Sequence, residues 1–234
     1  MNTLLENLLK SWQGCNINAK LQRMYVLSNL ATSIDGKIGT ADRSHFYLGT
    51  EEDRRNMQVL RKEVEAIIMG ATTIRGFKRP CLAKDAEKHP ANVIVSRSLE
   101  GLDPEWPFFK SDKIKRILFY SGHPSQQQMN ALTPSSELVK IDDSKPLAPQ
   151  ILKKLTDHGF KKVIVEGGGG VMWDFASQNL IDEYHLTLTP KVVGGDKAPT
   201  LVDGAGFKPE GVLSLKLHEC RQVGDELFLV YRKK

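Results

Sequence analysis

Short apolar segments alternate with helical segments along roughly the first 180 residues of this 234-residue chain. The strand-like segments are residues 24–31, 66–70, 91–96, 116–121, 137–141 and 161–166, and helical patterns cover residues 50–63, 146–159 and 171–179. Strands joined by helices run parallel, because each helix carries the chain back to the starting edge of the sheet. Residues 182–190 and two further strands, joined around Gly224 and Asp225, follow without intervening helices. The pattern predicts an α/β fold with a mostly parallel central sheet and an antiparallel C-terminal edge.

A separate helical pattern precedes the first strand. Apolar residues recur at helical spacing through residues 3–13, which predicts an amphipathic helix. We therefore expect an N-terminal helical extension over residues 1–22 and a single domain over residues 23–234. The extension could pack on that domain or on a second subunit.

Composition excludes several classes of protein. Hydrophobic residues make up 40% and charged residues 26%, as in ordinary globular proteins. The net charge is +5, but the lysines come in scattered pairs rather than in a basic tract, so no nucleic-acid partner is expected. No apolar run approaches the ~20 residues of a membrane span, and the N-terminus does not resemble a signal peptide. We expect a cytoplasmic protein. The three cysteines form no C-x-x-C pair, so neither a metal site nor a disulfide framework is expected.

The segment VIVEGGGG, residues 163–170, joins a strand to a helical pattern through four glycines. A strand that runs through glycines into a helix is a common phosphate site, because the free N–H groups and the helix dipole favour an anion. The segment is not a Walker A loop, since no Gly-Lys-Ser/Thr follows. It also fails the G-x-G-x-x-G spacing, because Val171 and Met172 stand where the last glycine would fall. The alternative is a flexible turn, although four glycines exceed what a turn requires.

A second strand-to-helix junction lies at IIMGATTIRGF, residues 67–77. Gly70 ends the strand, and Thr72 or Thr73 can either cap the next turn or contact a ligand. Arg75 is either a solvated charge or a partner for a phosphate monoester such as a 2′-phosphate. Two such junctions at one edge of a sheet suit a dinucleotide.

Two carboxylates stand at strand ends. Asp35 follows the first strand, where it forms either a simple turn or part of a site, and Glu166 ends the strand before the glycines. Arg61 is one possible partner for Glu166. The six histidines show no H-E-x-x-H, and no G-x-S-x-G nucleophile elbow occurs. Dinucleotide binding with carboxylates nearby favours hydride transfer over hydrolysis.

Three segments together resemble a known family. SNLATSIDGKIGT, LRKEVEAIIMGATT and VIVEGGGGVMWDFASQNLIDEYHLTLTPKVVGG are similar to the riboflavin-biosynthesis reductases, that is, to the RibD C-terminal type of domain. The resemblance covers most of residues 24–232. It implies a dihydrofolate-reductase-like, three-layer α/β/α fold and an NADPH-dependent reductase. The substrate implied is the ribosyl group of a diaminopyrimidine or aminouracil ribosylamine 5′-phosphate. A homodimer, often with the C-terminal strands at its interface, is also implied.

The resemblance also implies roles for individual residues. Cofactor contacts are expected from Ala31, Phe46, Thr73, Arg75, Gly168, Gly169, Gly170, Val171 and Met172. Substrate contacts are expected from Ser44, Arg61, Glu166 and Leu82, with Arg61 facing the substrate phosphate. Asp35 and Glu166 are the candidate catalytic residues, for orienting the substrate or relaying a proton.

One segment departs from the family. After its G-x-x-T element the family carries D-P-x-L-x-x-R, whereas this chain has RGFKRPCLAKD, with Lys78 and Arg79 in place of the acids. Lys84 is one possible substitute for the family's arginine. The zinc deaminase half of bifunctional members is not present in this sequence. Two alternatives stay open: a reductase of dihydrofolate or another pterin, and a nucleotide-binding module without turnover. Against the first, no acid is clearly placed in the early loop where dihydrofolate reductases carry their proton-relay carboxylate.

Overall fold

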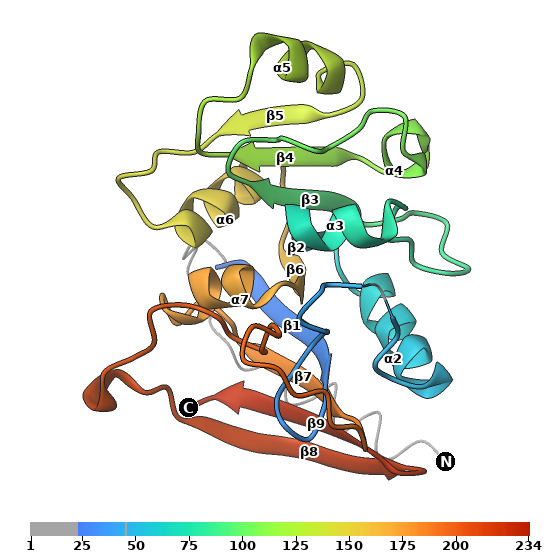
Figure 1. Cartoon of the computed structure of the whole chain (residues 1–234), viewed down its shortest axis with the longest axis vertical. Coiled ribbons are helices and arrows are strands. Elements are labelled where there is room, and N and C mark those ends of the chain that lie inside the picture. The colour runs from blue at the N-terminus through green and yellow to red at the C-terminus, as the bar shows by residue number, and fades with distance from the viewer. Residues whose placement is uncertain (1–22, 45) are drawn as a thin grey trace, which may run out of the picture.

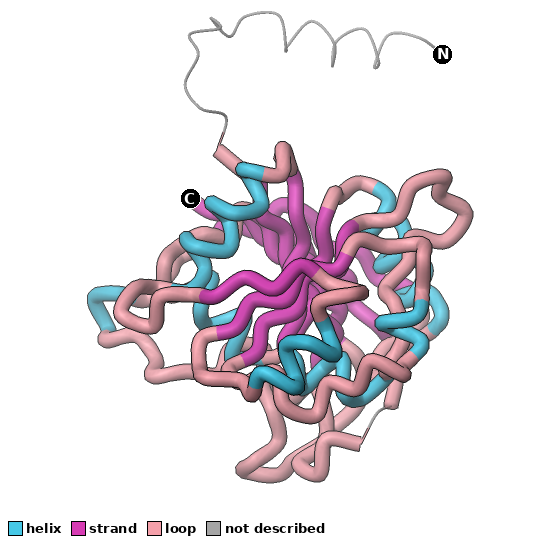
Figure 2. The backbone as a smooth tube through the Cα atoms, turned by 90° about the horizontal axis from the view of Figure 1, so that it is seen from above, coloured by secondary structure: helices cyan, strands magenta, loops and turns pink. Residues whose placement is uncertain are grey.

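The computed structural model describes residues 23–44 and 46–234. The helix expected over residues 3–13, with the whole N-terminal extension, lies outside the described residues. Within the described part of the chain, the strands form one nine-stranded sheet in the order β5-β4-β3-β2-β6-β1-β7-β9-β8. The sheet twists strongly along its length, with helices on both sides (Figure 2).

The parallel part of the sheet confirms the alternating pattern of the sequence. It consists of β1 (Tyr25–Thr32), β2 (Ala66–Gly70), β3 (Ala91–Ser96), β4 (Arg116–Tyr120), β5 (Glu137–Lys140), β6 (Lys162–Gly167) and β7 (Glu183–Leu188). The antiparallel edge is also confirmed, because β9 (Glu226–Lys233) pairs with β7 on one side and with β8 (Leu215–Val223) on the other.

Helices cover both faces of the sheet, which confirms the three-layer α/β/α arrangement (Figure 1). The helices α6 (Leu147–Asp157) and α7 (Gly169–Ala176) pack on one face and share a core with alternate residues of the central strands. The helices α2 (Glu51–Lys62), α3 (Ala71–Phe77), α4 (Pro107–Lys110) and α5 (Gln126–Leu132) supply the second core, on the opposite face. A short 3₁₀ helix, η1 (Pro209–Gly211), precedes β8. No helix among these is both long and apolar enough to cross a membrane.

Strand β6 shows why the apolar run in VIVEGGGG has no polar alternation. Val163 and Val165 belong to the core under α6 and α7, whereas Ile164 belongs to the core on the other face. All three side chains are fully buried. A strand at the centre of a parallel sheet is covered on both faces, so the positions in its middle are all apolar.

Several local predictions need correction. Helix α7 begins at Gly169 rather than at residue 171, so two of the four glycines are helical. The N-cap of α3 is Gly70, which puts Thr72 and Thr73 inside the first helical turn rather than in the capping position. Thr50 is the N-cap of α2, but its hydroxyl donates to Glu226 (2.6 Å) and accepts no N–H of its own helix.

Two helices were not predicted, α4 and α5. The sequence of α5, QQQMNAL, is too polar to show a clear helical period. Its start does carry a signal, because Ser125 is followed three residues later by Gln128, whose backbone N–H donates to the Ser125 hydroxyl (3.1 Å).

Candidate functional site

A cleft of about 480 Å³ opens where β1, β2 and β6 end. Its floor includes Asn29 and Ala31 of β1, Met69 of β2 and Glu166 of β6. Helices α2 and α3 and the loops around residues 38–49 and 79–81 form its walls. Small-molecule sites commonly have this volume, and in open parallel sheets they lie at the carboxyl ends of the strands.

The two strand-to-helix junctions lie side by side at this cleft. Strands β2 and β6 are neighbours, with Met69 paired to Gly167, so α3 and α7 begin next to each other. The Thr73 hydroxyl lies 3.3 Å from the position that a Cβ on Gly167 would occupy. Thr73 and Gly168 both line the cleft. The geometry therefore brings two helix N-termini, with their unpaired N–H groups, to one edge of one cleft.

The four consecutive positions differ in the physical reason for which they carry glycine. Gly167 leaves room for Thr73, and Gly168 has φ +76°, which favours glycine. A Cβ on Gly169 would lie 2.3 Å from a carboxylate oxygen of Asp203 and 2.5 Å from the Thr200 carbonyl oxygen. At Gly170, by contrast, no atom lies within 4 Å of such a Cβ. The chain's own loop thus occupies the approach to Gly169, and the open approach is at Gly170.

Arg61 and Glu166 form a buried ion pair at the cleft. The Arg61 Nε and Nη2 atoms donate to the two carboxylate oxygens at 2.8 and 2.5 Å, and both side chains are about nine-tenths buried. Burial disfavours the charge of Arg61, but Glu166 outweighs it and raises the pKa of Arg61 above its ordinary value. The partner suggested for Glu166 by the sequence is the one that it contacts, across 105 positions of sequence.

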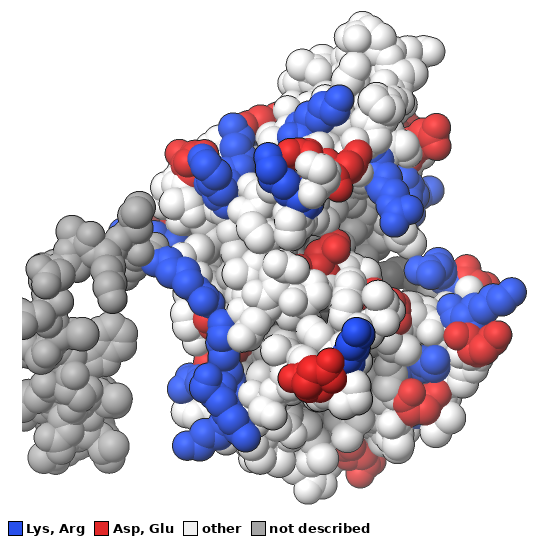
Figure 3. All heavy atoms as spheres, turned by 90° about the vertical axis from the view of Figure 1, so that its left-hand side faces the viewer, with Lys and Arg blue, Asp and Glu red and all other residues white. Residues whose placement is uncertain are grey.

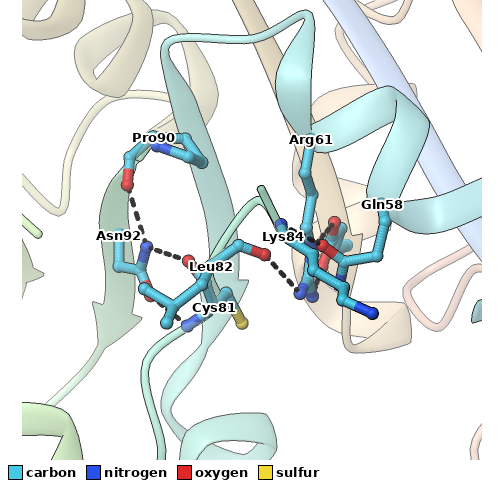
Figure 4. A network of polar contacts seen from close by, with 8 residues as sticks. Gln58, Arg61, Cys81, Leu82, Lys84, Pro90 and Asn92 are labelled. Atoms are coloured by element: carbon cyan, nitrogen blue, oxygen red, sulfur yellow. Dashed lines mark hydrogen bonds and ion pairs between the residues drawn. The ribbon is translucent and has the colours of Figure 1, made fainter. Parts of the chain in front are cut away.

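The loop between α3 and β3 is attached to this ion pair and to the sheet (Figure 4). Asn92 of β3 accepts the Cys81 N–H (2.8 Å), and its amide nitrogen donates to the Cys81 and Pro90 carbonyl oxygens. Arg61 donates to the Leu82 carbonyl oxygen (3.3 Å), and the Lys84 N–H donates to Gln58 (2.7 Å). These bonds fix the segment that departs from the family pattern.

Of the basic residues in that region, one faces the cleft. Arg75 donates to the Glu100 carbonyl oxygen, away from the cleft. The Lys78 ammonium lies 5.3 Å from the centre of the Trp106 ring. Arg79 lines the cleft and makes no hydrogen bond or ion pair with any residue that the structure describes. The Arg43 side chain, from the opposite loop, also lines the cleft and makes no hydrogen bond or ion pair with a described residue, although the Arg43 backbone N–H donates to the Thr40 carbonyl oxygen (3.0 Å).

Asp35 lies outside the cleft. Its carboxylate accepts hydrogen bonds from the Ser33 hydroxyl (2.7 Å) and from the N–H groups of Val193 (3.0 Å) and Gly194 (2.7 Å). These bonds, with that of Ser33 first, lower the pKa of Asp35 to about 2. The Asp35 carboxylate therefore ties the loop after β1 to the loop after β7.

The cleft residues that were not found from the sequence include Arg43, Asp53, Asn29 and Cys81. Burial raises the pKa of Asp53, which stands in the acidic first turn of α2 and reads in the sequence as a helix-start signal. Asn29 is buried, and its Oδ1 has no hydrogen-bond partner among the described residues. Burial raises the pKa of the Cys81 thiol to about 12, so Cys81 is a neutral packing residue rather than a nucleophile.

The cleft thus gathers about half of the predicted site residues. Those that line it are Ala31, Ser44, Phe46, Arg61, Thr73, Glu166 and Gly168. Those that do not line it are Asp35, Arg75, Leu82, Gly169, Gly170, Val171 and Met172. Leu82 contributes its carbonyl oxygen to Arg61, and the last four residues form the first turn of α7 beside the cleft.

The distribution of surface charge and the grouping of metal-ligating side chains indicate whether nucleic-acid or metal binding fits this protein. Basic and acidic side chains are interspersed over most of the face drawn in Figure 3, with a run of basic ones along one edge. Within the described ranges, no three His, Cys, Asp or Glu side chains are grouped so that they could hold a metal ion.

Comparisons with known proteins agree with this geometry. The family model of the RibD C-terminal domain matches residues 24–229. The 2,5-diamino-6-ribosylamino-4(3H)-pyrimidinone 5′-phosphate reductase of Methanothermobacter thermautotrophicus is 27% identical over 215 residues, covering 91% of this chain and 99% of that protein. The riboflavin biosynthesis protein RibD of Bacillus amyloliquefaciens is 28% identical over 218 residues, covering 88% of this chain but 56% of RibD. The chain therefore spans nearly all of the first relative and little more than half of the second.

Solved structures show the same fold. A pyrimidine reductase-like protein from Corynebacterium diphtheriae superposes with a TM-score of 0.80 at 19% identity, over 91% of this chain and 93% of that one. Dihydrofolate reductase from Enterococcus faecalis superposes with a TM-score of 0.50 at 12% identity, over 91% and 97% of the two chains. The dihydrofolate-reductase-like fold is confirmed.

Proposed function

The chain belongs to the RibD C-terminal domain family, whose members are reductases in riboflavin biosynthesis, and we propose that it reduces a pyrimidine ribosylamine 5′-phosphate with NADPH. The ribosyl group of the substrate would become a ribityl chain. One observation carries this proposal: two helix N-termini meet at one edge of a cleft whose other walls carry Arg43, Arg61 and Arg79. A cofactor with several phosphates and a phosphorylated substrate both suit such a cleft.

The residues at the junctions fit a dinucleotide. In the described part of the chain, no atom lies within 4 Å of a Cβ position on Gly170 or Gly76, so a ligand can approach their backbone closely. Thr73 and Gly168, which line the cleft, would hold the phosphates together with the first turn of α7. When bound, NADPH supplies the hydride that reduces the substrate.

The opposite side of the cleft would hold the substrate. The guanidinium groups of Arg43 and Arg79 make no hydrogen bond or ion pair with the described residues and suit the 5′-phosphate, since guanidinium groups pair with phosphate in a bidentate manner. The Arg61–Glu166 pair would orient the ribosylamine, because its charged groups are fixed before the ligand arrives. The Asn29 amide offers both a donor and an acceptor to the pyrimidine ring.

Binding and turnover test the proposal separately. Purified protein is titrated with NADPH and with NADH, and oxidation of the bound cofactor is then followed with three substrates: the diaminopyrimidine phosphate, the aminouracil phosphate and dihydrofolate. We expect NADPH binding and turnover of one of the two pyrimidines. Turnover of dihydrofolate alone would move the function to a pterin reductase. Binding without oxidation of NADPH by any of them would support a nucleotide-binding module instead.

We also propose that two copies of the chain associate through β8. This strand forms one edge of the sheet, and all but its first and last residues are exposed, including Leu217 on one of its faces. An uncovered edge strand invites pairing with another chain. Light scattering on the purified protein should give the mass of a dimer, and Leu217→Lys should shift it towards the monomer. A monomeric wild type at assay concentration would contradict this arrangement.

A further inference from the structure

The proposed reduction consumes a proton as well as a hydride, and the sequence leaves open which group supplies it. Among the described residues, the carboxyl groups that line the cleft are those of Asp53 and Glu166. Asp35 is outside the cleft and is fully engaged with two loop N–H groups and a hydroxyl. The choice therefore lies between Asp53 and Glu166.

Glu166 is poorly suited to give a proton. Each of its oxygens accepts a hydrogen bond from Arg61, and its side chain is only 8% exposed. Both carboxylate oxygens are therefore already engaged by one guanidinium and are held away from a substrate atom. Glu166 can orient a substrate without exchanging a proton.

Asp53 differs in its contacts. It projects from the first turn of α2, is half-buried and lines the cleft, and the buried Thr187 of β7 lies near enough to its carboxyl group to act on its pKa. The side chain folds closely over Gly49, where an added Cβ would lie 2.3 Å from Asp53 Oδ2. Because residue 49 is a glycine, the Asp53 carboxyl group has room to lie beside Thr187.

The charges around Asp53 favour its protonated form. Burial is the main cause of its raised pKa, and Glu226 of β9 and Glu166 of β6 act in the same direction. Thr187 and the neighbouring Arg54 of α2 oppose them without cancelling them. Glu226 is itself fixed by the Thr50 N–H and hydroxyl, and Glu166 by Arg61, so both carboxylates stay close to Asp53.

We infer that Asp53 is the proton donor of the reduction. The inference rests on the proposed function and names a catalytic group for it. In the substrate, the C1′–O4′ bond of the ribosylamine breaks, and the nitrogen lone pair forms a C1′=N bond while the nitrogen keeps its proton, so that the ring-opened form is an iminium ion. A hydride from the reduced nicotinamide forms the new C1′–H bond, and O4′ leaves with the proton of Asp53 as a hydroxyl. The Asp53 carboxylate then regains a proton from solvent.

The kinetic test compares Asp53→Asn with a matched neighbour. Asp53→Asn should lower kcat by about 10²-fold or more, the usual contribution of a general acid, while the Kd of NADPH stays unchanged. In the wild type kcat should fall as pH rises through the pKa of Asp53, because the acid must be protonated, and this fall should be absent in the variant. Glu52→Gln removes the preceding carboxylate, which pairs with Arg55 and Arg221 outside the cleft, and should leave kcat unchanged.

A second measurement does not depend on activity. The carboxyl carbon of Asp53, observed by NMR and assigned by its loss in Asp53→Asn, should titrate above the ordinary range of an aspartate. Because the folded pKa is raised, the ionised form disfavours folding. The unfolding free energy of the wild type should therefore fall relative to that of Asp53→Asn as pH rises from the unfolded pKa of an aspartate through the pKa of Asp53.

Gly49→Ala gives an independent variant in case Asp53→Asn does not fold. Its Cβ would displace the Asp53 carboxyl group, so it should also lower kcat, and the two changes combined should cost little more than one alone. If the wild type oxidises NADPH with neither pyrimidine phosphate, the proposed function fails and this inference fails with it. If the wild type turns over but Asp53→Asn keeps its rate and pH profile, only the assignment of Asp53 is overturned.

Discussion

The two sides of the cleft are built by different means. The proposed cofactor side consists of backbone, glycines and Thr73 at the ends of two neighbouring strands. The proposed substrate side consists of charged side chains that hold one another in place, such as Arg61 with Glu166. The cofactor side requires open space beside its backbone. The substrate side requires that each charged side chain keeps the partner that holds it in place. Substitutions should therefore separate them: added atoms should damage the first side, and removed atoms the second.

The largest effect is expected from breaking the buried ion pair. Arg61→Ala leaves Glu166 buried without its partner, which costs ~3–5 kcal/mol in comparable cases, and should abolish turnover. Urea denaturation monitored by circular dichroism measures the loss. In the control, Arg61→Met with Glu166→Leu replaces both charges by apolar groups and should recover much of the stability but none of the activity. An unfolding free energy of Arg61→Ala equal to that of the wild type would contradict the burial of this ion pair.

The next effect tests the side that depends on open space. Gly169→Ala places a Cβ against the Asp203 carboxylate and the Thr200 backbone carbonyl, so the loop at residues 200–203 must shift. We expect a loss of ~1–3 kcal/mol in unfolding free energy, as for other overpacked sites. The Kd of NADPH should rise as well, because the first turn of α7 moves with the loop. If stability is unchanged while NADPH binding is lost, the glycine contacts the cofactor rather than the loop.

A smaller effect should be confined to the substrate side. Asn92→Ala removes the acceptor of the buried Cys81 N–H and frees the loop between α3 and β3 (Figure 4). An unpaired buried N–H costs ~1–3 kcal/mol, and release of the loop should raise KM for the substrate but not the Kd of NADPH. Gln58→Ala, which removes the exposed contact to the Lys84 N–H, is the matched control and should stay within about 0.5 kcal/mol of the wild type. Equal changes in NADPH and substrate affinity would show that the loop serves both sides.

The same division explains what could be predicted from the sequence. The strands, their mostly parallel direction and the two junctions follow from local patterns, since β6 is apolar from Val163 to Val165 and glycines stand where the helix begins. The contact between Arg61 and Glu166 was only one suggestion among others, because it joins residues 105 positions apart. A linear pattern contains no information on which distant partner a charge will face.

Two residues show how local readings mislead. Asp53 was taken as one of three acids in a first helical turn, a sufficient explanation until β7 and β9 are placed beside it. Asp35 was a candidate catalytic residue because it ends a strand, yet the loop after β7 folds back and occupies its carboxylate. In both cases the C-terminal part of the chain, from β7 onward, decides the environment of a residue near the start.

The smallest effect is expected at Gly170. It lies next to Gly169 in the first turn of α7, so the two glycines can be compared directly. Unlike Gly169, it is exposed and has no atom within 4 Å of a Cβ position. Gly170→Ala should therefore leave the fold intact and raise the unfolding free energy by up to ~1 kcal/mol, because alanine favours a helix more than glycine does. The new methyl group would stand on the open approach to the α7 N-terminus, so the Kd of NADPH should rise several-fold while KM for the substrate stays the same. A more stable protein with unchanged NADPH affinity would remove Gly170 from the phosphate site and leave Thr73 and Gly168 to form it, since these two line the cleft.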